Sequence, residues 1–217
     1  MELTDDSEKW IKHYSSRHRI LLVGEGDFSF AASLARAFGN ASNMVATSLD
    51  TQVYLDIKHP SAAANVALLK EKGCSVMHGV DASTMSNQPL LSHRKFDRVV
   101  FNFPHAGFFT SESSSIQIIV RHQDVVRGFL KNAYEMVSDR GEVHITHKTA
   151  HPFSAWGIEK LGEEAGFMLM DKAYFCIWDY PGYWNKRGDG SRSNETFPVG
   201  ECSTYKFTRN LNVDIKC

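Results

Sequence analysis

RILLVGEGDFSF, residues 19–30, joins a short apolar run to a turn with two glycines and then to a segment of helical character. A brief apolar run that stops at glycine is typical of a buried strand ending in a tight turn. Phe30, Leu34 and Phe38 then recur every four residues until Gly39, which is the pattern of one face of a helix. This stretch therefore predicts a strand, a glycine-containing loop and a helix.

The alternation of apolar runs with amphipathic segments continues along the chain. Including the first, seven strands are predicted, at 19–23, 44–49, 74–80, 98–101, 142–147, 167–175 and 202–208. Helices are predicted over 61–72, 116–137 and 155–164. Alternating strands and helices form a mostly parallel open sheet with helices on both faces, and the last two strands fit an antiparallel edge hairpin.

Composition restricts the class of protein. The 217 residues carry 24 Lys plus Arg and 25 Asp plus Glu, a net charge of −1, which excludes a strongly basic nucleic-acid coat protein. A polar lead-in or short helix over 1–18 and a single domain over 19–217 are expected at this length. The four cysteines are widely spaced, which favours reduced thiols in an intracellular protein. No apolar run approaches the ~20 residues of a membrane span, and the acidic N-terminus is unlike a signal peptide.

Polar or glycine-rich residues follow each of the first five predicted strands. They are Gly24–Asp27, Asp50, Asp81, Asn102–His105 and His147–Lys148. Because ligands of open α/β sheets bind at the carboxyl ends of the strands, this distribution predicts a binding site along one edge of the sheet.

The loop Gly24-Glu25-Gly26-Asp27 has glycines that allow close backbone approach by a ligand. Ser29 stands where the dinucleotide pattern G-x-G-x-x-G requires its third glycine. Glu25 and Asp27 would repel phosphate and attract a sulfonium or ammonium group. These features favour a nucleoside without phosphates, such as S-adenosylmethionine, over a dinucleotide. A plain strand-to-helix turn is the alternative.

Two later acids fit the same nucleoside. Asp50 at the end of the second strand is placed to accept the ribose hydroxyls. Asp81 and Ala82 follow the third strand, where they would hold the adenine amino group while Val80 packs on the ring. Turn or capping residues are the alternative for each.

Asn102-Phe103-Pro104-His105 is a proline-stiffened loop beside the predicted cofactor. Such a loop can hold a planar base, and an Asn amide can donate to or accept from its edge. The alternative is a simple strand-end turn. A metal site is not expected, because His144 and His147 would lie on opposite faces of a strand.

Tyr180–Gly188, YPGYWNKRG, interleaves aromatic and cationic side chains. Aromatic rings stack on unpaired bases and Lys or Arg meet phosphates, so Tyr180, Tyr183, Lys186 and Arg187 are candidate RNA contacts. A solvated surface loop is the alternative.

Together these motifs resemble the 25S ribosomal RNA uridine-N3-methyltransferase-like family, from about residue 19 to 208. The matching segments are Val23–Phe30, Asp50, Gly79–Ala82, Phe96–His105, His147–Thr149, Tyr180–Tyr183 and Asn185–Gly188. Ser83 stands where the family pattern has Thr, which keeps the hydroxyl group.

The resemblance implies a Rossmann-like class I methyltransferase fold that uses S-adenosylmethionine to methylate uridine N3 in large-subunit ribosomal RNA. It extends the cofactor-binding set to Phe28, Ser29, Phe30, Asn102, Phe103 and Pro104. Ribosomal RNA or a pre-ribosomal particle is the expected partner, in the nucleolus, nucleus or cytoplasm.

Methyl transfer to N3 requires loss of the N3 proton. His105 is the expected proton acceptor, and Asn102 is expected to hold a carbonyl oxygen of the base. Lys148 or Lys186 would stabilise the negative charge on the ring oxygens. The competing readings are a non-catalytic module that holds S-adenosylmethionine and RNA, a dinucleotide oxidoreductase, and a methyltransferase acting on protein or a small molecule.

Overall fold

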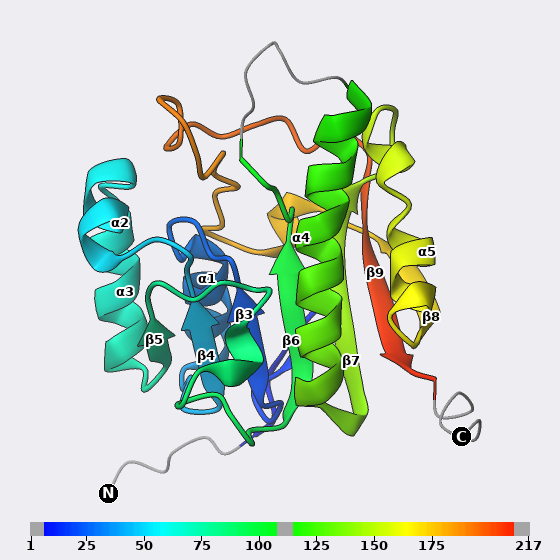
Figure 1. The fold of residues 1–217 in the computed structure, drawn as a ribbon. Coiled ribbons are helices and arrows are strands. Elements are labelled where there is room, and N and C mark those ends of the chain that lie inside the picture. Colours follow the sequence, from blue (N-terminus) through cyan, green and yellow to red (C-terminus); the bar gives the residue numbers. More distant parts are fainter. Residues whose placement is uncertain (1–6, 108–114, 211–217) are drawn as a thin grey trace, which may run out of the picture.

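A computed structural model describes residues 7–107 and 115–210 of the chain. In this part, seven strands form one sheet in the order β5-β4-β3-β6-β7-β9-β8 (Figure 1). In chain order they are β3 (Ile20–Val23), β4 (Met44–Thr47), β5 (Ser75–Met77), β6 (Phe96–Asn102), β7 (Val137–Lys148), β8 (Phe167–Tyr174) and β9 (Cys202–Arg209). Strand β9 runs antiparallel to both β7 and β8, whereas the other pairings of this sheet are parallel, which confirms the mostly parallel sheet with an antiparallel pair at its edge.

Helices cover both faces of the sheet, as predicted (Figure 1). The α-helices are α1 (Ser29–Phe38), α2 (Gln52–Lys58), α3 (Ala62–Glu71), α4 (Ser115–Met136) and α5 (Ile158–Glu164). The short 3₁₀ turns are η1 (Met85–Asn87), η2 (Phe153–Trp156) and η3 (Ile177–Asp179).

The central strand β3 explains the two layers, because successive side chains of a strand point to opposite faces. Leu21 and Val23 pack in the core with α4, while Ile20 and Leu22 pack in the core with α1. All four residues are buried, so the strand is apolar throughout rather than alternating.

Two elements differ from the sequence-based expectation. The polar lead-in contains a small hairpin, β1 (Trp10–Ile11) and β2 (Tyr14–Ser15), where a segment or short helix was expected; its residues 1–6 lie outside the described part. Long-range contacts hold it, since the Tyr14 hydroxyl lies 3.2 Å from Nδ1 of the buried His144. Helix α2 was not predicted, because it buries only Leu55 and therefore lacks an apolar stripe.

The strand order reverses at β3, which pairs with β4 on one side and with β6 on the other. The loops after β3, β4, β5 and β6 therefore meet at one edge of the sheet. The long segment between η3 and β9, orange in Figure 1, also crosses this edge. None of the helices in the described part of the chain combines the length and apolarity needed to cross a lipid bilayer.

Candidate functional site

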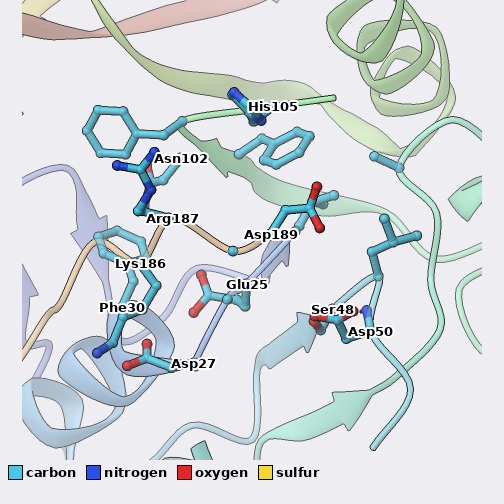
Figure 2. Close-up of a pocket in the computed structure, with 18 of the residues that line it drawn as sticks. Glu25, Asp27, Phe30, Ser48, Asp50, Asn102, His105, Lys186, Arg187 and Asp189 are labelled. Atoms are coloured by element: carbon cyan, nitrogen blue, oxygen red, sulfur yellow. Dashed lines mark hydrogen bonds between the residues drawn. The ribbon is translucent and has the colours of Figure 1, made fainter. Parts of the chain in front are cut away.

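A cavity of about 430 Å³ opens at the carboxyl ends of β3, β4 and β6 (Figure 2). Figure 2 shows Asp50 on one side of this cavity and Asn102 and His105 on the other, with Glu25 between them. Of the predicted cofactor-binding residues, the following line it: Gly24, Glu25, Gly26, Asp27, Phe30, Asp50, Asp81, Ala82, Asn102 and Phe103. The structure thus gathers residues that are up to 79 positions apart in the chain, as the strand-end pattern predicts.

The loop after β3 lies tightly against β6. Gly24 has a φ of +68° and a Cβ there would overlap the ring of Phe101, so this position requires glycine. Glu25 donates its backbone N–H to the carbonyl of Thr47, 2.8 Å away, which fixes the loop to the end of β4.

Both acids of this loop accept hydrogen bonds from the start of α1. Glu25 Oε2 lies 3.1 Å from the Ala31 nitrogen, and Asp27 Oδ1 lies 3.0 Å from the Ser29 nitrogen. Burial raises the pKa of Glu25 to about 8, with the nearby Asp27 adding to the rise and the Ala31 N–H opposing it. The loop therefore offers a desolvated carboxyl group that gains from a cationic ligand.

Three predicted cofactor residues do not line this cavity. Phe28 is fully buried with a φ of 60°, and its ring packs 5.6 Å from that of His78. Ser29 turns its hydroxyl to the backbone of Trp184, whose N–H lies 2.9 Å away. Pro104 lines a neighbouring cavity instead. The side chains of Phe28 and Ser29 point into the protein, so these residues hold the loop in place and do not face the cavity.

Asp50 and Asp81 are each held by a partner. The Nζ atom of Lys58, on α2, lies 2.8 Å from Asp50 Oδ1 and also lines the cavity. Asp81 Oδ1 accepts the backbone N–H and the hydroxyl of Ser83, each at 2.7 Å. The hydroxyl that Ser83 retains thus orients the Asp81 carboxylate.

Asn132, a buried residue of α4, holds the loop after Asp81. Its Oδ1 accepts the N–H of Ser86 at 3.0 Å, and its Nδ2 donates to the carbonyl of Ser83 at 2.6 Å. Asn132→Ala is expected to lower the free energy of unfolding by about 2 kcal/mol, since buried partners lose their hydrogen bonds. Denaturant titration measures this loss. The exposed neighbour variant Lys131→Ala should stay within about 0.5 kcal/mol of the unmodified protein, and equal stabilities for the two variants would contradict the role of Asn132.

Asn102, the last residue of β6, presents an unpaired side chain to the cavity. Its Nδ2 and Oδ1 atoms are both buried, and neither has a hydrogen-bond partner within residues 7–107 and 115–210. A buried amide without partners costs free energy, so this side chain indicates a ligand that supplies a donor and an acceptor.

His105 lies at the border of the cavity. Its Nδ1 accepts the backbone N–H of Gly107 at 2.9 Å, so a neutral ring carries its proton on Nε2. Desolvation lowers the pKa of His105, with Asp189 opposing this effect and Arg187 adding to it. The ring is therefore neutral near pH 7 and acts as a hydrogen-bond donor through Nε2.

Three rings support the His105 loop, and the sequence analysis singled out only one of them, His147. Trp156 stacks on His122 with centroids 4.2 Å apart and contacts His147 at 4.3 Å. His122 Nδ1 accepts the N–H of Ala106, 3.0 Å away. Burial lowers the pKa values of His122 and His147 to about 4 each, so both rings are neutral. Their positions 122, 147 and 156 come from three different elements, and no local spacing relates them.

His144 and His147 lie on opposite faces of β7, as predicted. His144 contacts Tyr14, whereas His147 contacts Trp156 on the other side. Within residues 7–107 and 115–210, no three His, Cys, Asp or Glu side chains are grouped as metal ligands.

The aromatic and basic loop, Tyr180–Gly188, places some of its side chains in the cavity and others in the core. Tyr183, Lys186 and Arg187 line the cavity. Tyr180 does not, since it is 3% exposed and its ring stacks on Phe175 at 5.6 Å. The expectation that Tyr180 contacts RNA is therefore corrected, because the core already covers its ring.

Comparison with known proteins finds one matching family model and several related proteins. The family model described as rRNA (uridine-N3-)-methyltransferase BTM5-like matches residues 21–187. An uncharacterized Arabidopsis thaliana protein is 56% identical over 94% of this chain and 99% of its own length. The heavy metal-associated isoprenylated plant protein 41 of the same plant is 50% identical, and this chain spans 39% of it. The 25S rRNA (uridine(2634)-N(3))-methyltransferase of Saccharomyces cerevisiae is 23% identical over 84% of this chain and 69% of that protein.

Solved structures of similar fold are methyltransferases. A TehB-like SAM-dependent methyltransferase from Corynebacterium glutamicum matches with a TM-score of 0.51 and 18% identity, over 88% of this chain and 80% of that one. NSun6 from Pyrococcus horikoshii, solved with SFG, matches with a TM-score of 0.60 and 14% identity, over 90% of this chain and 48% of that one. These likenesses confirm the Rossmann-like methyltransferase fold.

Proposed function

The chain belongs to the rRNA (uridine-N3-)-methyltransferase BTM5-like family, and from this premise we propose that it methylates N3 of a uridine in large-subunit ribosomal RNA. Family and fold make it an S-adenosylmethionine-dependent methyltransferase. The finer assignment, a uridine of ribosomal RNA, is supported by the family description and by the yeast relative.

The first cavity fits the cofactor. The glycine loop admits close backbone approach, and the carboxyl group of Glu25 suits the cationic part of the cofactor. Asp50 keeps Oδ2 for the ribose, while Asp81 and Ala82 flank the adenine end. When bound, S-adenosylmethionine supplies an electrophilic methyl group.

The unpaired amide of Asn102 is the observation that carries the proposed reaction. It lies where the end of β6 meets both the cofactor cavity and the loop of His105. In the proposed complex Asn102 donates to a carbonyl oxygen of uracil, and His105 Nε2 donates to the edge of the base. The Gly107 contact favours this donor role over the role of proton acceptor expected from the sequence.

The substrate is expected to be unpaired RNA, because a base must leave its stack to enter a recessed site. A net charge of −1 limits non-specific attraction to RNA. The proposed partner is therefore a pre-ribosomal particle that presents the unpaired RNA segment to the enzyme. The nucleolus, nucleus and cytoplasm are the compartments in which such particles occur.

The test combines binding and product analysis. Calorimetry with S-adenosylmethionine is expected to show micromolar affinity, and incubation with unmodified large-subunit RNA is expected to yield 3-methyluridine in nucleoside mass spectrometry. Cofactor binding without any methylated nucleoside would support the non-catalytic module instead. A different methylated nucleoside would contradict the uridine assignment.

A further inference from the structure

A second cavity of about 190 Å³ adjoins the first. The two share Phe103, His105, Lys186 and Arg187 as lining residues, so these four side chains form the border between them. The rest of the second cavity is formed by the end of β7, by residues after β6 and β7, and by one residue of the long loop: His147, Lys148, Pro104, Phe153, Trp156 and Phe197.

Its walls are largely aromatic. Phe153 and Trp156 belong to η2, and Phe197 stands opposite on the segment before β9. The ring of Phe103 meets that of Phe197 edge to face, with centroids 5.2 Å apart. A cavity with aromatic walls and a few cationic groups suits a planar, polar ring rather than an aliphatic side chain.

Lys148 is the cation held between these walls. Its Nζ lies 4.8 Å from the centroid of Phe153 and 4.9 Å from that of Phe197. No carboxylate within the described residues forms an ion pair with it, whereas Lys58, Lys172 and Lys206 are paired with Asp50, Glu159 and Asp171. A half-buried ammonium that faces a cavity without a counter-charge is complementary to an anionic ligand group.

Lys186, the other candidate from the sequence, is engaged differently. Its Nζ donates to the carbonyl oxygen of Asn194 at 2.9 Å. Lys148 has no such partner among the described residues, so the structure distinguishes two lysines that the sequence left equivalent.

We propose that the second cavity receives the target uracil and that the Lys148 ammonium contacts a carbonyl oxygen beside N3. This inference rests on the proposed function. With the ring between Phe153 and Phe197, N3 faces the border with the cofactor cavity, where His105 lies. Loss of the N3 proton to a water molecule leaves a negative charge shared by O2, N3 and O4, and Lys148 stabilises that charge. N3 then forms the new bond to the methyl carbon, while sulfur keeps the electron pair of the bond that breaks.

This contact also selects the base. Uracil has an N3–H that can ionise between two carbonyl oxygens. Cytosine has an amino group in place of one carbonyl and cannot form the same anion. The amino group of cytosine stands where uracil has O4, so the Lys148 ammonium, which only donates, selects uracil when the carbonyl oxygen it meets is O4.

Other charged and titratable groups near Lys148 affect the pKa of its ammonium group. Desolvation lowers the pKa of Lys148, Arg187 lowers it further, and Cys202 opposes this. His105, from the loop after β6, and His147, from β7, also line the cavity, and both have lowered pKa values. A bound anion would raise the pKa of Lys148, and by linkage the protein would lower the pKa of the bound base.

The test measures that ionisation directly. The probe is 5-fluorouridine 5′-monophosphate, bound to the protein saturated with S-adenosylhomocysteine, and the fluorine NMR shift is followed against pH. The unmodified protein is expected to lower the N3 pKa of the bound probe by about one pH unit relative to the free probe. Lys148→Gln should abolish this shift, and Lys148→Arg, which keeps the charge, should retain most of it.

Lys172→Gln is the matched control, because Lys172 also lies near an aromatic ring, 4.9 Å from the centroid of Tyr205, but lines neither cavity. It should behave as the unmodified protein. An equal pKa shift in Lys148→Gln would overturn the role of Lys148, and no binding of the probe to the folded protein would overturn the pocket. Absence of 3-methyluridine with ribosomal RNA, despite a normal probe shift, would instead remove the proposed function and leave a uracil-binding site.

Discussion

Asn102→Ala is expected to reduce the rate of methyl transfer by about 100-fold to 1,000-fold, the usual cost of removing one preorganised donor to a developing oxyanion. The amide of Asn102 has no hydrogen-bond partner in the part of the chain that the structure describes, so its donor and acceptor are available to a ligand. Removing it relieves an unpaired buried amide, and the melting temperature should therefore not fall. A loss of activity without a loss of stability is the expected signature.

Two measurements separate an effect on methyl transfer from an effect on cofactor binding. Single-turnover rates at saturating cofactor report the loss of activity, and calorimetry should show nearly unchanged affinity for S-adenosylmethionine. Asn102→Asp keeps the shape but removes the donor, so its rate should fall as far as that of the Ala variant. Asn43→Ala, at the opposite edge of the sheet, is the control and should retain full activity. Normal turnover in both Asn102 variants would refute the proposed contact with the base.

Glu25→Gln is expected to remove a large pH dependence of stability. The pKa of Glu25 is about 8 in the folded protein, against 4.5 for an ordinary Glu, so the folded state binds the additional proton between these values. The free energy of unfolding of the cofactor-free protein therefore falls as the pH rises from about 4.5 to 8, by up to about 5 kcal/mol. In Glu25→Gln this slope should be absent, as denaturant titrations at a series of pH values would show.

Because the pKa of Glu25 is raised, we expect protons to be released when the cofactor binds. A cationic ligand beside Glu25 favours its ionised form, so the unmodified protein should release protons when it binds S-adenosylmethionine near pH 7. Calorimetry in buffers with different ionisation enthalpies measures this release. Glu25→Gln should release none and bind about tenfold more weakly, equivalent to about 1.4 kcal/mol. Glu163→Gln, an exposed change on α5, should behave as the unmodified protein. Identical proton release in the two variants would exclude Glu25 from the cofactor site.

The strand ends show what a sequence pattern can predict. The acids and amides after β3 to β6 come together because parallel strands share one edge, and that follows from the order of apolar runs alone. The opposite faces of His144 and His147 follow in the same way from the two-residue period of a strand.

The misjudged residues all depend on contacts between distant segments. Tyr180 lies in an aromatic and basic run typical of an RNA-binding loop, yet Phe30 and Phe175 cover its ring. His122 and Trp156 belong to the site only because α4 and η2 meet beside β7. No local spacing records such a meeting.

By itself, the sequence determined the α/β class, the mostly parallel sheet, the methyltransferase resemblance and the edge that carries the cofactor site. These properties depend on local periodicity and on rules of strand connection, which act over short stretches of chain. The tertiary structure alone decided that the amide of Asn102 lacks partners among the described residues, that Lys186 but not Lys148 donates to a backbone carbonyl there, and that Tyr180 lies in the core. Burial and pairing are set by whichever side chains the fold brings within contact distance, and only the folded chain specifies them.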